Sequence, residues 1–136
     1  MSYISIYIHC VWGTKHRDPV FFTYEERREL FQHIYEVALQ NSIYVDTIGG
    51  WRDHVHCLIE LQSEQSLSSV IHQIKGESAH WYNVEKEGKL VWQDEYFAAS
   101  VSKSRLEIVR KYIRSQEVHH LCHTFAEEYT QFTTRL

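Results

Sequence analysis

The strongest constraint on the fold is the run at residues 53–61, DHVHCLIEL, in which polar and apolar residues alternate as they do along a β-strand. Residues two apart on a strand point to the same face of its sheet. His54 and His56 therefore lie side by side, while Val55 and Cys57 face the other way, as core residues do. Two neutral imidazoles on a rigid face can form half of a divalent-metal site. A polar pair on a solvent-facing strand is the alternative interpretation.

Apolar spacing along the chain predicts alternating strands and helices. The expected strands lie at residues 3–12, 43–48, 53–61, 89–92 and 96–102, and the expected helices at 23–41, 66–83 and 104–116, with a short helix from Thr124. Capping boxes, a Ser or Thr followed three residues later by Glu, support the helix starts at Thr23, Ser104 and Thr124. Gly49-Gly50, with residues 51–53 after them, predict a turn.

The order strand–helix–strand–strand–helix–strand is typical of the ferredoxin-like, split βαβ fold, an antiparallel sheet of the α+β class. We expect two helices to cover the sheet face that carries Ile4 and Ile6. His9, His54 and His56 are then expected on the opposite face, with the late helix docked on or beside them.

The composition indicates one globular domain over residues 1–136, with 43% hydrophobic and 24% charged residues. No stretch reaches the roughly 20 apolar residues that a membrane span needs, and the N-terminus lacks the basic start of a signal peptide. The three cysteines include no CxxC pair, which argues against a structural zinc site and fits reduced thiols. We therefore expect a cytoplasmic protein with no membrane partner. A net charge of −4 does not by itself indicate a nucleic-acid binder.

The helix expected at residues 104–116 carries groups that are capable of chemistry. Tyr112 and Gln116 are four residues apart and so share a helix face. A Tyr phenol activated by nearby cations can be a covalent nucleophile, and a Gln oxygen can join two histidines as a metal ligand. A half-buried Tyr beside a surface Gln is the structural alternative, and it is the better one for these two residues alone. Basic residues gather in the same segment, at Lys103, Arg105, Arg110, Lys111 and Arg114.

Together these segments resemble the single-tyrosine HUH transposases of small bacterial and archaeal insertion sequences, the IS200-like family. The resemblance is carried by DHVH at residues 53–56 and by YIRSQ at residues 112–116. Similar segments run along nearly the whole chain, at residues 11–17, 48–50, 74–78, 91–96, 117–120 and 124–128. His-x-His alone is short and arises by chance, whereas the ordered set of segments is specific.

The resemblance implies an enzyme that cuts and rejoins single-stranded DNA at the ends of a mobile element. Tyr112 would attack the scissile phosphate and form a 5′-phosphotyrosine link. His54, His56 and Gln116 would hold Mg²⁺ or Mn²⁺, which polarises the phosphate. The resemblance also implies recognition of DNA hairpins near the element ends. It further implies a homodimer in which the tyrosine helix of one subunit completes the site of the other.

Basic side chains are the candidates for DNA contacts, because they neutralise phosphates. The residues that we assign to DNA binding are Lys15, Arg17, Arg52, Lys103, Arg105, Lys111 and Arg114. Further imidazoles and one acid are possible competitors for the metal, at His119, His120, His123 and Glu60.

Two other functions fit the sequence. A domesticated, repeat-associated relative would use the same chemistry on host repeats. A non-catalytic ferredoxin-like nucleic-acid-binding module would instead use rings such as Tyr7 and Tyr96 to stack bases, and Tyr112 would then be structural.

Overall fold

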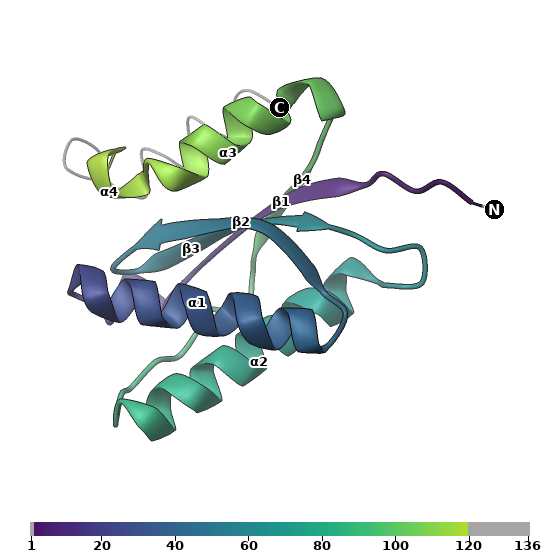
Figure 1. The fold of residues 1–136 in the computed structure, drawn as a ribbon. Coiled ribbons are helices and arrows are strands. Elements are labelled where there is room, and N and C mark those ends of the chain that lie inside the picture. The colour runs from purple at the N-terminus through teal and green to yellow at the C-terminus, as the bar shows by residue number, and fades with distance from the viewer. Residues whose placement is uncertain (1, 120–136) are drawn as a thin grey trace.

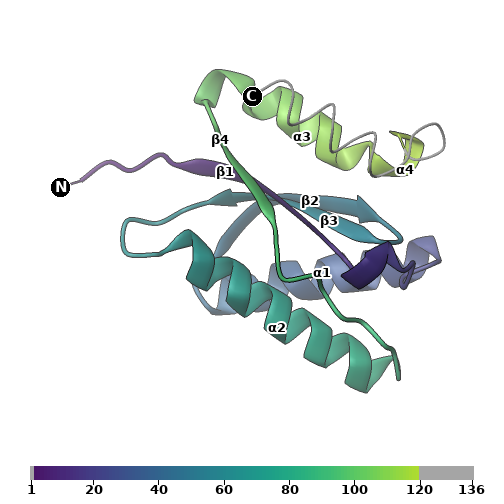
Figure 2. The ribbon, with the colours of Figure 1, turned by 180° about the vertical axis from the view of Figure 1, so that it is seen from behind.

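The computed structural model describes residues 2–119, which form a four-stranded antiparallel sheet with helices on both faces (Figures 1 and 2). The strands are β1 (Tyr7–Gly13), β2 (Tyr44–Trp51), β3 (His54–Glu60) and β4 (Phe97–Val101), in the order β2-β3-β1-β4. The helices are α1 (Tyr24–Gln40), α2 (Leu67–Glu85), α3 (Leu106–Arg114) and α4 (Gln116–His119), with 3₁₀ turns η1 (Lys15–Arg17) and η2 (Lys103–Arg105). This topology confirms the predicted ferredoxin-like fold.

One face of the sheet is covered by α1 and α2, which begin at hydroxyl caps. Thr23 Oγ1 accepts a hydrogen bond from the Glu26 amide at 3.1 Å, as predicted, and Ser66 caps α2 in the same way. The main core lies between these helices and the sheet, and includes Cys10, Trp12, Val55, Cys57, Ile59, Leu30, Ile34, Val70, Ile71 and Ile74. The apolar side of the alternating run is therefore the core side. Within residues 2–119, every helix is too short or too polar to cross a lipid bilayer.

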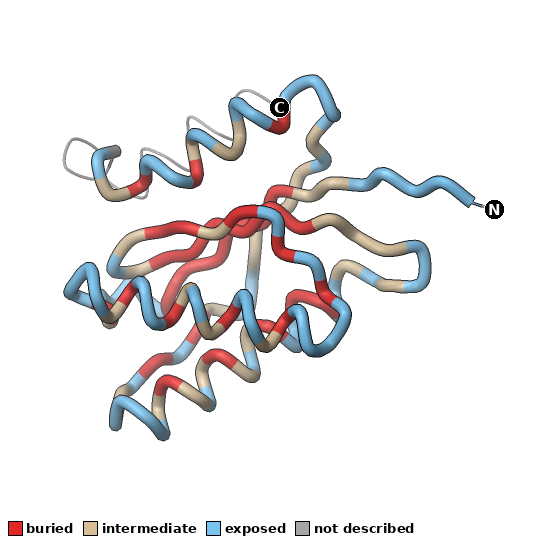
Figure 3. The backbone as a smooth tube through the Cα atoms, in the orientation of Figure 1, coloured by how far each residue is buried: buried red, intermediate tan, exposed pale blue. Residues whose placement is uncertain are grey.

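The opposite face of the sheet is covered by α3 (Figure 1). Leu58 packs there against Leu106 and Ile113 in a second, smaller buried cluster. With both faces covered, every residue of β3 from His54 to Ile59 is buried (Figure 3). His54 is 0% exposed and His56 is 2% exposed, so the interpretation as a polar pair on a solvent-facing strand is wrong.

The first strand begins later than predicted. Ile4 and Ile6 were expected in the core, but they are 42% and 41% exposed. The reason lies in the neighbouring strands, because β3 and β4 both end opposite Tyr7, at Glu60 and Val101. Residues before Tyr7 have no strand on either side to continue the sheet.

The turn predicted at residues 49–53 is confirmed at Arg52 and Asp53, but its first three residues are wrong. Both glycines lie inside β2, which continues to Trp51 and pairs that residue with His54. The turn consists of Arg52 and Asp53. The glycines serve close packing instead, as described below.

The last predicted elements differ in their extent. Residues 89–92 form no strand, only a single bridge between Trp92 and Thr14. The helix expected at residues 104–116 is a 3₁₀ turn followed by α3, a break at Ser115, and α4. The Ser104 capping box is wrong, because Ser104 lies inside η2 and α3 starts without a side-chain cap. The helix expected from Thr124 lies outside the described residues.

Candidate active site

His54 and His56 lie on β3 beneath α3, and each ring is held through its Nδ1 atom. His54 Nδ1 is 2.8 Å from Oδ1 of Asp53, the residue just before the strand. His56 Nδ1 is 2.9 Å from Nε2 of His9 on the neighbouring strand β1. A ring held at Nδ1 presents Nε2 for coordination, which is the arrangement typical of metal-ligating histidines.

Gln116 faces His54 from the other side of the site. Its side chain is 1% exposed, so it is not the surface residue of the structural alternative. Its Nε2 donates to the carbonyl oxygen of Tyr112 at 3.1 Å, and its Oε1 is 3.3 Å from Nε2 of His54. The break in the helix at Ser115 thus still leaves Gln116 connected to the residue four positions before it.

These atoms are a suitable donor set for a hard divalent cation. Two imidazoles and one amide oxygen converge where His54 and Gln116 meet, with the His54 and His56 ring centroids 5.1 Å apart. The described residues contain no group of three or more His, Cys, Asp or Glu arranged to hold a metal. Among the described residues, the Gln116 amide oxygen is the further donor that lies beside the two imidazoles.

Tyr112 lies in the last turn of α3, directly against the histidines. Its ring meets the His56 ring edge-on at 5.6 Å between centroids, and the His9 ring at 6.2 Å. These are histidines of the same chain. The assembly of one site from two subunits, which the family resemblance implies, stays a prediction.

The sequence model of the family described as "Transposase IS200 like" matches residues 2–116, which include both histidines, Tyr112 and Gln116. The chain belongs to the IS200-like transposase family. This result confirms the resemblance that the ordered motifs indicated, and it identifies the protein as a transposase.

Relatives with known names agree with this family. The "ISDra2 transposase TnpA" of Deinococcus radiodurans is 30% identical over 115 residues, which cover 79% of this chain and 81% of that protein. The fold matches the crystal structure of a protein assigned as a transposase from Deinococcus radiodurans R1, with a TM-score of 0.66, 22% identity, and coverage of 85% of this chain and 95% of that one. It also matches a REP-associated tyrosine transposase bound to a REP hairpin, with a TM-score of 0.65, 18% identity, and coverage of 88% and 72%.

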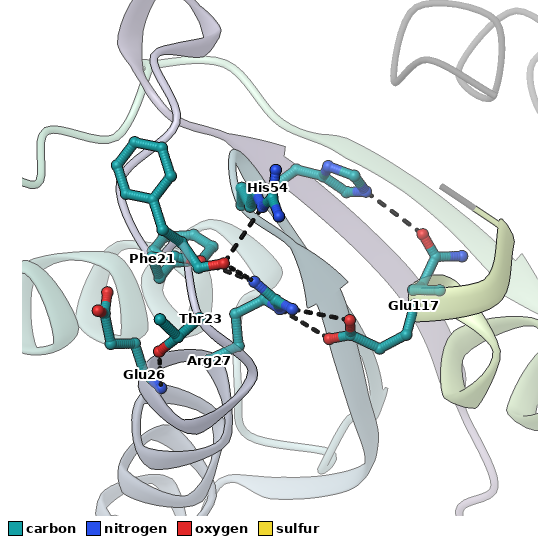
Figure 4. A network of polar contacts seen from close by, with 9 residues as sticks. Phe21, Thr23, Glu26, Arg27, His54 and Glu117 are labelled. Atoms are coloured by element: carbon teal, nitrogen blue, oxygen red, sulfur yellow. Dashed lines mark hydrogen bonds and ion pairs between the residues drawn. The ribbon is translucent and has the colours of Figure 1, made fainter. Parts of the chain in front are cut away.

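An arginine that the sequence did not single out attaches the end of the tyrosine segment to α1. Figure 4 shows Arg27 between the backbone of Phe21 and the carboxylate of Glu117. Arg27 is 4% exposed. It donates to both Glu117 oxygens, at 2.7 and 2.8 Å, and to the carbonyls of Phe21 and Phe22. Such bidentate charged pairs are directional, so this contact fixes Glu117 and, next to it, Gln116.

One signal for Arg27 was present in the sequence. It lies on the apolar stripe of α1, three residues before Leu30 and seven before Ile34, where a charged residue requires buried partners. Those partners lie 90 residues away and at the helix start, so periodicity alone could not name them.

Gly49 brings the tyrosine helix close to the sheet of the transposase. It pairs with His56 across β2 and β3, on the face that α3 covers. A Cβ atom at this position would lie only 2.3 Å from the carbonyl oxygen of Ile113, the residue after Tyr112. The missing side chain therefore determines how near Tyr112 can come to His54 and His56.

The residues assigned to DNA binding are all exposed, as phosphate contacts require. Five of them lie at the histidine end of the sheet. Lys15 and Arg17 follow β1, at the point where the Thr14 amide donates to the carbonyl oxygen of Asp53. Arg52 is in the β2–β3 turn, and Lys111 and Arg114 flank Tyr112. Lys103 and Arg105 lie at the other end, in η2, after the strand residue that pairs with Tyr7. The structure thus places five of the seven near the site.

Arg110, from the same basic segment, is engaged with acids of the transposase itself. Its guanidinium donates to both Asp46 oxygens, at 2.9 and 2.8 Å, and to Glu107 at 2.6 Å. The hydrogen bond from Arg110 holds the pKa of Asp46 below its usual value. This arginine attaches α3 to β2 and was not among the DNA-binding assignments.

The buried thiols take no part in the site. Cys10 and Cys57 pair across β1 and β3 within the main core. Burial raises the pKa of Cys10 to about 12 and also raises that of Cys57. Both thiols lie on the core side of the sheet, opposite the face that carries His54 and His56.

Proposed function

We propose that the protein is a metal-dependent single-stranded DNA transposase that cleaves and rejoins element ends through a 5′-phosphotyrosine intermediate. The observation that carries this proposal is the packing of Tyr112 on His56, at 5.6 Å between ring centroids, with Gln116 Oε1 3.3 Å from His54 Nε2. One nucleophile and three candidate ligands meet at one point of the fold.

Tyr112 is the nucleophile in the proposed reaction. The Tyr112 oxygen attacks phosphorus and forms the new P–O bond, while the bond from phosphorus to the 3′ oxygen breaks. The phenol loses its proton, and the departing 3′ oxygen gains one to become a free hydroxyl. Rejoining is the reverse attack by a 3′-hydroxyl on the phosphotyrosine, so the energy of the cut bond is retained.

His54, His56 and Gln116 would hold Mg²⁺ or Mn²⁺, which supplies charge stabilisation at the phosphoryl oxygens. Asp53 orients His54 through Nδ1. Lys111 and Arg114, on either side of Tyr112, are exposed and would contact the phosphates of the strand.

The test is covalent trapping on single-stranded DNA that carries an element end. Wild-type protein with Mg²⁺ or Mn²⁺ should give an adduct on a denaturing gel, and Tyr112→Phe should bind the DNA but give none. Tyr96→Phe is the matched control and should still form the adduct. An adduct with Tyr112→Phe would mean that another residue is the nucleophile, and the proposal would be wrong.

We also propose that the active enzyme is a homodimer in which Tyr112 of one subunit meets His54 and His56 of the other. The connector before α3 is short, because β4 fixes residues 97–101 in the sheet. The segment that remains to redirect α3 is Ser102 to Arg105. Exchange of α3 between subunits would therefore depend on a change of backbone direction at η2.

Mixing two inactive proteins tests the shared site. Tyr112→Phe subunits combined with His54→Ala/His56→Ala subunits should recover cleavage if the sites are shared, because each heterodimer then contains one intact set. Verified heterodimers without activity would exclude the shared arrangement.

Host repeats are the second candidate substrate. The observation that favours them is the fold match to a REP-associated tyrosine transposase, which is itself bound to a REP hairpin. Imperfect hairpins bordering the gene would indicate a mobile element. If the protein instead binds and cuts hairpin repeats that are scattered elsewhere in the genome, the domesticated role is indicated. The open sheet platform that a non-catalytic binding module would need is covered by α3, and Tyr7 packs against that buried cluster.

A further inference from the structure

His9 lies in the active site without a role so far. It sits on β1 and is 0% exposed. Its Nε2 is 2.9 Å from Nδ1 of His56, and the two rings stack at 5.1 Å with 29° between their planes. We propose that His9 is a positioning residue that holds His56 in the tautomer and ring plane needed to bind the metal. This inference rests on the proposed function.

The strand register keeps His9 beside His56. In the β1–β3 pairing, His9 is opposite Leu58 and Val11 is opposite His56. His9 and His56 are therefore diagonal neighbours on one face of adjacent antiparallel strands, within reach of each other's rings. The hydrogen-bonded ladder of the two central strands fixes this relationship, so the contact does not depend on a mobile loop.

The tautomer follows from what a metal requires. A cation binds a nitrogen lone pair, so coordination through His56 Nε2 places the ring proton on Nδ1. That N–H then donates to Nε2 of His9, whose own proton is on Nδ1. The opposite polarity, with His9 as donor, would place the His56 proton on Nε2 and block that atom from the metal.

The neighbouring histidine shows the same arrangement with a different partner. His54 is held at Nδ1 by the Asp53 carboxylate, 2.8 Å away. Both candidate ligands are thus held at Nδ1, His54 by an acid just before the strand and His56 by a neutral ring on the neighbouring strand. In both rings Nε2 would then be the atom that coordinates the metal. The His9 ring also contacts the Tyr112 ring edge-on at 6.2 Å, so one side chain touches both the ligand and the nucleophile.

Two substitutions separate the hydrogen bond from simple packing. His9→Phe fills the space but removes the acceptor atom, the Nε2 of His9. His9→Gln places a side-chain oxygen at about the same distance from the backbone as that Nε2 atom, so it can accept the hydrogen bond from His56 instead. Cys10→Ala is the control for stability, because Cys10 is the adjacent buried residue on the opposite face. Mn²⁺ affinity of the full chain without DNA is measured by electron paramagnetic resonance of the free ion, and folding by thermal unfolding.

We expect His9→Phe to weaken Mn²⁺ binding roughly 10- to 100-fold, the usual effect of removing a partner of a ligating histidine. His9→Gln should recover most of that affinity, and Cys10→Ala should bind Mn²⁺ as wild type does. Long-range ¹H–¹⁵N spectra of the metal-free wild type should show His56 protonated on Nδ1. Wild-type affinity in a folded His9→Phe protein, or equal losses in His9→Phe and His9→Gln, would overturn the inference.

The spectra decide the question even if His9→Phe does not fold, because a His56 proton on Nε2 in the wild type overturns the inference by itself. Failure of the proposed function gives a different result. In that case the wild type binds no Mn²⁺ and forms no adduct, whereas failure of the His9 role alone leaves both intact.

Discussion

Substitution of Gly49 by Ala is the sharpest test of how the tyrosine helix is placed. The new Cβ would lie 2.3 Å from the Ile113 carbonyl oxygen, whereas real Cβ atoms essentially never come closer than 3.0 Å. The helix must therefore retreat by at least about 0.7 Å. No described glycine has a positive φ, so Ala is compatible with the backbone and the contact alone causes the effect.

The retreat moves Tyr112 and Gln116, because Ile113 lies between them on the same segment. A misplacement of about 1 Å can reduce an enzymatic rate by about 100-fold. We expect Gly49→Ala to slow adduct formation by about 10- to 100-fold and, as overpacking does, to destabilise the fold by about 1–3 kcal/mol.

The assay is single-turnover adduct formation on single-stranded end DNA, together with thermal unfolding of the same samples. Gly76→Ala is the matched control, since nothing lies within 4 Å of a Cβ built there. Gly76 is inside α2, where Ala should stabilise by about 0.5–1 kcal/mol and leave the rate unchanged. A Gly49→Ala protein with the wild-type rate would refute the idea that this contact sets the position of Tyr112.

Three further predictions concern the metal, the substrate and the ion pair of Arg27. Chelation with EDTA should abolish cleavage while circular dichroism shows the fold intact, because the core is built without the ligands; unfolding on chelation would indicate a structural metal. Single-stranded ends should be cut and the same sequence as a perfect duplex should not, as gel assays with matched oligonucleotides can measure; equal cutting of both would contradict this. Glu117→Gln should destabilise the protein by about 1–3 kcal/mol in denaturant titrations, because the buried Arg27 loses its carboxylate partner; unchanged stability would show that the pair contributes nothing.

Local periodicity explains what the sequence revealed. The two-residue period placed His54 and His56 on one face and the core on the other, and the spacing of Tyr112 and Gln116 brought both into the site. These are relationships within one strand or one short segment. The fold class followed from the succession of elements along the chain.

Relationships across elements were beyond the sequence. The contact of His9 with His56 depends on the β1–β3 register, and the function of Gly49 depends on where α3 docks. The ion pair of Arg27 joins residues 90 positions apart. Ile4 and Ile6 show that a local pattern can also predict too much. The alternation continues into these residues, but they are exposed because the neighbouring strands end opposite Tyr7.

The burial of the histidines beneath α3 has a consequence for the order of events. With His54, His56 and Gln116 at 0%, 2% and 1% exposure, a phosphate has no direct approach to them while α3 is docked. The helix that carries Tyr112 is thus also the cover over both histidines, and in the proposed function DNA would reach them only after it lifts. Its buried cluster of Leu58, Leu106 and Ile113 is small beside the main core. Local opening of α3 would expose that cluster and break the Arg110–Asp46 and Arg27–Glu117 pairs, while the sheet and main core stay folded. In the proposed function, substrate binding and the placement of Tyr112 would then be a single event, the closing of α3 onto the strand of DNA.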